Sequence, residues 1–215
     1  MDSPKMVFID NTPKDPVEMF SNILKAYKTA KPEELFIPMS ISTIDDEFGT
    51  LNRTIVYRGL VDGDVIFVSE RNSVKYANLI KDPRIAACFL LCMKDQNGID
   101  VVWQIRIMGK AVELPENQIA NLYTEEPVYA KIRNRINVSG KPVNFAEQKA
   151  AFDKLLKQYE DGQDSLPQTN SYTAFKIVPT VWDFYKSEPN SIADRVQYRK
   201  GKSNDEKWSV MHVAS

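Results

Sequence analysis

The chain has 215 residues, of which 43% are hydrophobic and 27% are charged, and its formal net charge is −1. This length suits one domain with a hydrophobic core of ordinary size. The composition is that of a globular protein that folds without metal or disulfide staples. A net charge near zero excludes a strong overall attraction for nucleic acid or an anionic membrane, so an anion site must be built locally.

No apolar run reaches the roughly 20 residues of a membrane helix, and residues 1–14 lack the apolar core of a signal peptide. We expect a cytoplasmic protein with no membrane contact, a single domain over residues 1–215 and a flexible segment at 1–14. The single histidine, His212, disfavours a metal site and a Ser-His-Asp triad. Cys88 and Cys92 lie in an apolar run and are interpreted as core residues. A redox pair is disfavoured because a strand separates them too widely.

The first half of the chain is predicted to be a helix followed by strands. Asp15 is a good N-cap and Pro16 a good first residue for a helix that ends at Lys31. An Asp-Gly pair at 62–63 predicts a hairpin turn, and Ser73 predicts the cap of a short helix through residue 79. Strands are expected at 35–42, 53–58, 65–69, 85–93 and 101–114.

The second half is predicted to hold helices and then strands again. One helix begins at Pro115, another covers 145–159, and the polar stretch 133–142 between them is interpreted as a loop. Strands are expected at 172–178, 181–185, 194–199 and 208–213. Short turns between successive strands indicate antiparallel pairing. The predicted class is therefore mainly β (α+β), with a barrel or a strongly curled sheet and flanking helices.

Basic residues cluster around one hairpin and one helix start. Arg53 and Arg58 bracket a strand, and Lys75 lies in the first turn of the short helix after Ser69 and Ser73. A helix N-terminus with hydroxyl groups and cations nearby favours phosphate binding. Solvated surface charges are the alternative interpretation.

Two further groups of residues are candidates for ligand contact. Gln104 and Arg106 point to the same face of one strand, which is either wet or in contact with a polar ligand, because burying them unpaired is costly. Aromatic residues up to Tyr185, near Arg195, indicate either a stacking site or core packing.

These residues also carry a resemblance to the pyridoxamine 5′-phosphate oxidase family. It extends from about residue 36 to the end of the chain and rests on the order and spacing of several short motifs. The motifs are Arg53-Thr-Ile-Val-Tyr-Arg58-Gly59, Phe67-Val-Ser69, Ser73-Val-Lys75, Asp82-Pro83, Gln104-Ile-Arg106-Ile-Met-Gly109, Val181-Trp-Asp-Phe-Tyr185, Asp194-Arg195-Val-Gln-Tyr198 and Trp208. The resemblance implies an antiparallel split β-barrel that dimerises, with two FMN molecules at the interface between the chains.

The resemblance also implies roles for individual residues. Arg53 and Lys75 would bind the FMN phosphate with help from Ser69, and Gln104 would hydrogen-bond the flavin. The backbone of residues 54–56 would lie along the flavin ring, and two residues of the partner chain would reach it. The predicted cofactor-binding set is Arg53, Thr54, Ile55, Val56, Val68, Ser69, Val74, Lys75, Gln104, Arg106, Ser139, Gly140, Tyr185 and Arg195, and the last two are the partner contacts. The predicted substrate-binding residues are Arg58 and Tyr123. No catalytic residue is assigned.

The chain departs from the family pattern at several of these positions. Val74 stands where the family has the Arg of an Arg-Lys pair, and Ser139-Gly140 stands where it has Gln-Ser. At the positions that hold the substrate phosphate, Glu126 stands for Arg and Ala130 for Ser. Each lost charged contact costs about 1.5–3 kcal/mol, so the substrate site is expected to be altered more than the flavin site.

Three hypotheses follow. The first is an FMN-dependent oxidoreductase resembling the oxidases of vitamin B6 metabolism, with a diverged substrate site. The second is a non-catalytic split-barrel protein that binds FMN or another flat anionic ligand. The third, a purely structural dimer, is disfavoured because the flavin-site residues are present together.

Overall fold

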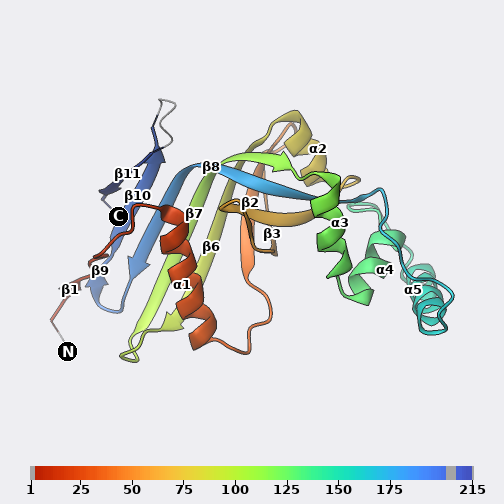
Figure 1. Cartoon of the computed structure of the whole chain (residues 1–215), viewed down its shortest axis with the longest axis horizontal. Helices are drawn as coiled ribbons and strands as arrows, with labels where there is room; N and C mark the ends of the chain where they lie inside the picture. The colour runs from red at the N-terminus through yellow and green to blue at the C-terminus, as the bar shows by residue number, and fades with distance from the viewer. Residues whose placement is uncertain (1–2, 202–206, 215) are drawn as a thin grey trace.

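The computed structural model describes residues 3–201 and 207–214, and its centre is a large antiparallel sheet (Figure 1). The strands are β1 (Lys5–Met6), β2 (Pro38–Asp45), β3 (Gly49–Val56), β4 (Leu60–Val61), β5 (Asp64–Glu70), β6 (Arg84–Lys94), β7 (Asp100–Glu113), β8 (Tyr172–Ser187), β9 (Ser191–Ile192), β10 (Asp194–Lys200) and β11 (Trp208–His212). The helices are α1 (Pro16–Ala30), α2 (Val74–Lys81), α3 (Glu116–Thr124), α4 (Val128–Ile136) and α5 (Phe145–Glu160).

The order of strands in the main sheet is β11-β10-β8-β7-β6-β2-β3, and every pairing along it is antiparallel. The first part of β8 pairs with β5 and its second part with β10, while β7 runs along its other side. The predicted class, a mainly antiparallel split barrel with flanking helices, is confirmed, and the sheet curls without closing.

Helix α1 begins as the sequence predicts. The Asp15 side chain accepts a hydrogen bond from the Val17 backbone N–H, and Pro16 follows at the first helical position. The apolar stripe of α1 packs on the sheet, where Phe20 lies 5.1 Å from the ring centroids of both Phe89 and Trp182. Figure 1 shows α1 across the sheet, with α3, α4 and α5 at the opposite end from β1 and β9.

A β-bulge interrupts the register between β7 and β8. The pairing shifts between Met108 and Gly109, which faces Pro179. A Cβ atom at Gly109 would lie 2.1 Å from the Val178 carbonyl oxygen, so only glycine fits there. The bulge lies inside one continuous strand, β8, where we predicted two strands. The reason is that β7 is long enough to pair with both halves of β8.

Three other expectations differ from the structure. Residues 133–136 belong to helix α4, although the polar sequence indicated a loop. The cysteines are free and lie outside the core, because Cys88 is half-buried and Cys92 exposed on the face opposite the buried Phe89. Within the segment 1–14, expected to be flexible, β1 pairs in parallel with β9 and Val7 is buried.

Among the described residues, no helix is both long and apolar enough to cross a membrane.

Candidate functional site

The candidate site is a cavity of about 480 Å³ between the β3–β5 region and helix α4. Its walls come from β3, β5, the first turn of α2, and the chain from α4 to residue 139. Seven of the predicted cofactor residues line it, and the predicted substrate residue Arg58 lines it with them. The seven are Thr54, Ile55, Val56, Val68, Ser69, Lys75 and Ser139.

The start of α2 brings hydroxyl groups and a cation to this cavity. The Ser73 side chain caps α2 by accepting a hydrogen bond from the Tyr76 N–H, and its Oγ lies 3.3 Å from that of Ser69. Lys75 follows in the first turn and makes no ion pair with any described residue. Partial burial lowers the pKa of Lys75; Glu70 counteracts this shift, whereas the charges of Arg53 and Arg133 add to it. Lys75 therefore lies in an electropositive part of the cavity that favours an anion.

Arg53 lies just behind this wall, outside the cavity lining. Its Nη1 donates hydrogen bonds to the Thr43 hydroxyl, at 2.7 Å, and to the Leu51 carbonyl, at 2.9 Å. These bonds hold the guanidinium beside β2 and β3, close enough to affect the pKa of Lys75.

Arg58 is held by a buried carboxylate. Its Nη2 lies 2.7 and 3.0 Å from the two oxygens of Glu126, whose side chain is only 3% exposed. The Tyr172 hydroxyl donates to Glu126 at 3.0 Å, and burial, followed by the charge of Glu126, raises the pKa of this tyrosine. The cation on this side of the cavity is therefore already neutralised within the chain.

Helix α4 contributes residues that our sequence analysis missed. Arg133 and Asn134 both line the cavity, as does Asn137 after the end of the helix. The interpretation of residues 133–142 as a loop hid them. The available signal was the pair of Pro127 and Asn137, which stand at the two ends of an uninterrupted stretch free of Gly and Pro.

Gln104, Arg106, Tyr185 and Arg195 lie away from this cavity, on β7, β8 and β10. Arg106 and Arg195 both bind Asp183, which is fully buried; the contacts are 3.1 Å from Arg106 and 2.7–3.0 Å from Arg195. The partner of Arg106 is thus a carboxylate on the neighbouring strand. Our sequence analysis gave Asp183 no role. The signal for it is the alternation of polar residues in two strands that pair with each other.

The strand register nevertheless places Arg106 and Asp183 on the same face of the sheet as Thr54, which lines the cavity. Directly opposite partners run from Thr54 on β3 through Ser40 and Cys88 to Arg106 and Asp183. Directly opposite residues share a face, and three interstrand steps of roughly 4.8 Å separate Thr54 from Arg106.

The remaining predicted residues have other surroundings. Tyr123 is buried, and its hydroxyl donates to the backbone carbonyls of Leu166 and Pro167. Val74 is 48% exposed at the start of α2, and Gly140 is exposed next to Ser139. None of these three is among the described residues that line the cavity.

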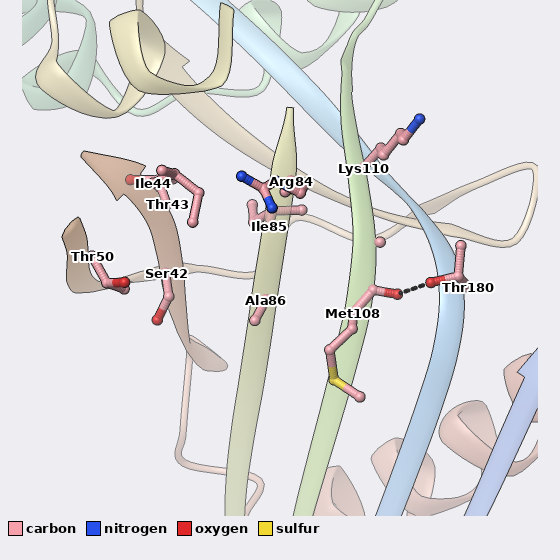
Figure 2. A pocket seen from close by; sticks show the side chains of 11 residues that line it. Ser42, Thr43, Ile44, Thr50, Arg84, Ile85, Ala86, Met108, Lys110 and Thr180 are labelled. Carbon is pink, nitrogen blue, oxygen red and sulfur yellow. Dashed lines mark hydrogen bonds between the residues drawn. The ribbon is translucent and has the colours of Figure 1, made fainter. Parts of the chain in front are cut away.

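A second hollow of about 470 Å³ lies on the sheet over β2, β6 and β7. Figure 2 shows Ala86 and Met108 on neighbouring strands in it and Arg84 nearby, with the Thr180 hydroxyl donating to the Met108 carbonyl. None of the predicted cofactor residues lines this hollow. The cavity with Lys75, which holds seven of those residues, is therefore the candidate site for the predicted cofactor.

No family model matches the chain. A pyridoxine/pyridoxamine 5′-phosphate oxidase of Bacteroides thetaiotaomicron is 25% identical over 203 residues, which cover 94% of this chain and 90% of that protein. The chloroplastic pyridoxine/pyridoxamine 5′-phosphate oxidase 1 of Arabidopsis thaliana is 23% identical over 182 residues; the match covers 82% of this chain but only 32% of that longer protein.

Two solved structures share the fold over nearly the whole chain. PhzG from Burkholderia lata, solved with tetrahydrophenazine-1-carboxylic acid, has a TM-score of 0.79 and 18% identity, with 100% of both chains covered. A pyridoxamine 5′-phosphate oxidase-related, FMN-binding protein from Nostoc punctiforme has a TM-score of 0.70 and 15% identity, with 91% of this chain and 97% of that chain covered. Over most of its length the chain is thus similar in sequence to pyridoxine/pyridoxamine 5′-phosphate oxidases, and it shares the fold of the two solved structures.

Proposed function

We propose that this protein is an FMN-dependent oxidoreductase whose substrate site differs from that of the pyridoxamine 5′-phosphate oxidases. The observation that carries the proposal is the single cavity in which Thr54, Ser69 and Lys75 come together. The relatives named as oxidases and the FMN-binding neighbour support the same cofactor.

The chemistry of the cavity fits FMN. Its volume of about 480 Å³ lies within the range of roughly 300–1,000 Å³ that is usual for small-molecule sites. Lys75 and Arg133 supply positive charge for a phosphate, and Ser69 lies beside the capped start of α2. The Asn134 side-chain amide is buried and lacks an acceptor among the described residues, as expected of a group that binds a ligand.

Bound FMN would supply the redox chemistry, and the chain supplies binding, orientation and electrostatics. Lys75 holds the anionic end of the cofactor and thereby sets its position in the cavity. The β3 backbone at residues 54–56 provides a flat wall along the same cavity. The apolar Val56 and Val68 exclude water from that side.

The substrate side favours a compound without a phosphate group. Arg58 is the cation that the resemblance assigns to a substrate phosphate, and Glu126 already neutralises it at 2.7 Å. An adjoining hollow of about 320 Å³ is lined by the cations Lys28 and Arg58 and by three carboxylates, Glu34, Glu125 and Glu126. The phosphate group of a substrate would therefore meet a hollow with more negative than positive charge.

The test is the absorbance spectrum of the purified protein, followed by titration with FMN. We expect the purified protein to show a flavin spectrum or to bind FMN saturably. We also expect the substrate, an organic compound that donates electrons, to reduce the bound flavin and bleach its absorbance. Absence of FMN binding at micromolar concentrations would contradict the proposal. Tight binding without bleaching by any candidate substrate would instead support the second function, a non-catalytic FMN-binding protein, which the neutralised Arg58 favours.

A further inference from the structure

The electropositive end of the candidate cavity has cations from two separate parts of the chain. Lys75 comes from the first turn of α2, whereas Arg133 comes from α4, 58 positions later in the printed sequence. Val74, the first residue of α2, brings no charge and is 48% exposed. Helix α2 by itself thus offers one cation to a ligand in this cavity.

Arg133 is an exposed residue of α4. Its side chain makes no hydrogen bond or ion pair with the described residues, although the next arginine in α4, Arg135, is bound to Asp164 at 3.2 Å. It lies near enough to Lys75 for its charge to lower that lysine's pKa. Two cations that face one cavity repel each other. Glu70, which also lines the cavity, offsets part of this repulsion, and a bound anion removes more of it.

Asn134, the residue after Arg133 in α4, gives a second and independent observation that points to a bound ligand. Asn134 lines the same cavity and is only 5% exposed. Its side-chain oxygen accepts a hydrogen bond from the Thr169 hydroxyl, but its Nδ2 has no partner in the described part of the chain. A buried amide donor without an acceptor is unfavourable, and a ligand bound in this cavity would supply the missing acceptor.

We propose that α4 forms the second half of the cofactor's phosphate site, with Arg133 as the cation that complements Lys75 and Asn134 as a neutral donor beside it. The proposal rests on the proposed function and extends it, because it assigns phosphate recognition to a helix outside the β3–α2 region. A phosphate monoester carries up to two negative charges and several acceptor oxygens. Two cations and an amide match this chemistry better than Lys75 alone.

The first experiment compares FMN with riboflavin, which lacks the phosphate. Dissociation constants are measured by quenching of flavin fluorescence for the wild type, Arg133→Gln and the control Lys154→Gln. Lys154 is an exposed lysine of α5 outside the cavity, so the control makes the same change in net charge. We expect Arg133→Gln to weaken FMN binding about tenfold, as for the loss of one charge-assisted hydrogen bond, and to leave riboflavin binding within about twofold. The control should leave both unchanged.

A rescue variant and an isosteric variant complete the test. In the Arg133→Gln background, Val74→Arg should restore most of the FMN affinity, because it returns a second cation from the α2 side. Asn134→Asp keeps the acceptor for Thr169 but replaces the free donor with a negative charge, and it should weaken FMN binding more than riboflavin binding. Circular dichroism of each variant shows whether it is folded.

The outcomes separate this inference from the proposed function. If FMN binds and Arg133→Gln leaves its affinity unchanged, the role of α4 is wrong and the flavin function stands. Equal weakening of FMN and riboflavin would assign Arg133 to the architecture of the cavity and overturn its phosphate role. If the wild type binds neither flavin, the proposed function itself fails.

Discussion

At the scale of single residues, Asp183 is a buried charge held by three side chains. It is fully buried on β8 and is bound by Arg106, Arg195 and Gln197. Burial alone would raise the pKa of its carboxyl group, but the hydrogen bonds from Arg195, Gln197 and Arg106 outweigh it and keep the pKa below its ordinary value. The carboxylate therefore joins three strands through one buried group.

We predict that Asp183→Asn lowers the free energy of unfolding by about 2–4 kcal/mol, since breaking a buried ion pair leaves charges unmatched. Urea denaturation at pH 7 measures this, with the exposed pair Lys149–Asp153 as a control. Asp153→Asn should change stability by no more than about 0.5 kcal/mol. A similar, small effect of both substitutions would contradict the role of Asp183.

The same carboxylate gives the stability of the protein a pH dependence of defined sign. Because the folded-state pKa of Asp183 is lowered, its contribution is complete above its unfolded-state pKa of about 4 and is lost as the pH falls through the folded-state value. Between pH 5 and pH 2.5, the free energy of unfolding measured by denaturation should therefore fall less steeply with decreasing pH for Asp183→Asn than for the wild type. Parallel curves would show that this residue does not control acid stability.

Glu126 gives a prediction about substrate choice. We expect the wild type to turn over pyridoxamine 5′-phosphate poorly, because Glu126 neutralises Arg58. Glu126→Gln keeps the shape of the side chain and frees Arg58. It should raise kcat/KM for this compound by about tenfold, the effect of one charge-assisted contact. The assay is aerobic formation of pyridoxal 5′-phosphate with saturating FMN.

The control for this substitution is Glu125→Gln, because Glu125 is exposed and lines only the adjoining hollow. It makes the same change in net charge and should leave kcat/KM nearly unchanged. Wild-type turnover near the usual enzyme median of about 10 per second would show that the substrate site is not altered as we propose.

At the scale of elements, the bulge between β7 and β8 connects two parts of the sheet. It allows β8 to pair with β7 from Phe175 to Ser187, while β5 and β10 share its other edge. Gly109 is essential to it, because a Cβ atom there would overlap the backbone of Val178. The sequence around Gly109 contains no turn signal, and only the approach of β8 explains the glycine.

We predict that Gly109→Ala destabilises the protein by about 3 kcal/mol or more, since the clash is with backbone that cannot move independently. Gly98→Ala is the matched comparison, because Gly98 has a φ of +78° but open space around a Cβ atom. Strain alone should cost it about 1–2 kcal/mol. Equal losses of unfolding free energy for the two variants, measured by urea denaturation, would mean that the bulge relaxes around the new side chain.

At the scale of the whole molecule, the predicted flavin residues fall into two groups. Seven of them, including Lys75, line one cavity, whereas Gln104, Arg106, Tyr185 and Arg195 lie elsewhere on the sheet. The family resemblance assigns Tyr185 and Arg195 to the partner's flavin, and a second copy packed on this sheet face would bring both groups to one site. Leu90 lies on the same face, opposite Gln104, and is 59% exposed.

We therefore predict a homodimer, with twice the monomer mass of 24.6 kDa in light scattering at micromolar concentration. Leu90→Glu should dissociate it, because a charge would be buried in the interface. Phe145→Glu, at an exposed phenylalanine of α5, should leave the mass unchanged. A monomer mass for the wild type would contradict the prediction.

The sequence by itself determined the features that depend on local chemistry. The α1 cap at Asp15, the two-residue turn at Asp62-Gly63 and the cap of α2 at Ser73 follow from neighbouring residues, and the structure contains all three. Periodicity and turn spacing also predicted the antiparallel class, because alternation and short connections leave few other arrangements.

Only the tertiary structure decided which polar residues meet. Arg133 looked like part of a polar loop, since a short helix is stabilised mainly by the elements it packs against, here α5. The pairing of Arg58 with Glu126 joins residues 68 positions apart, and that of Arg106 with Asp183 joins residues 77 apart. Such pairings depend on strand register and on the path of the chain across the sheet, and local sequence patterns do not contain that information.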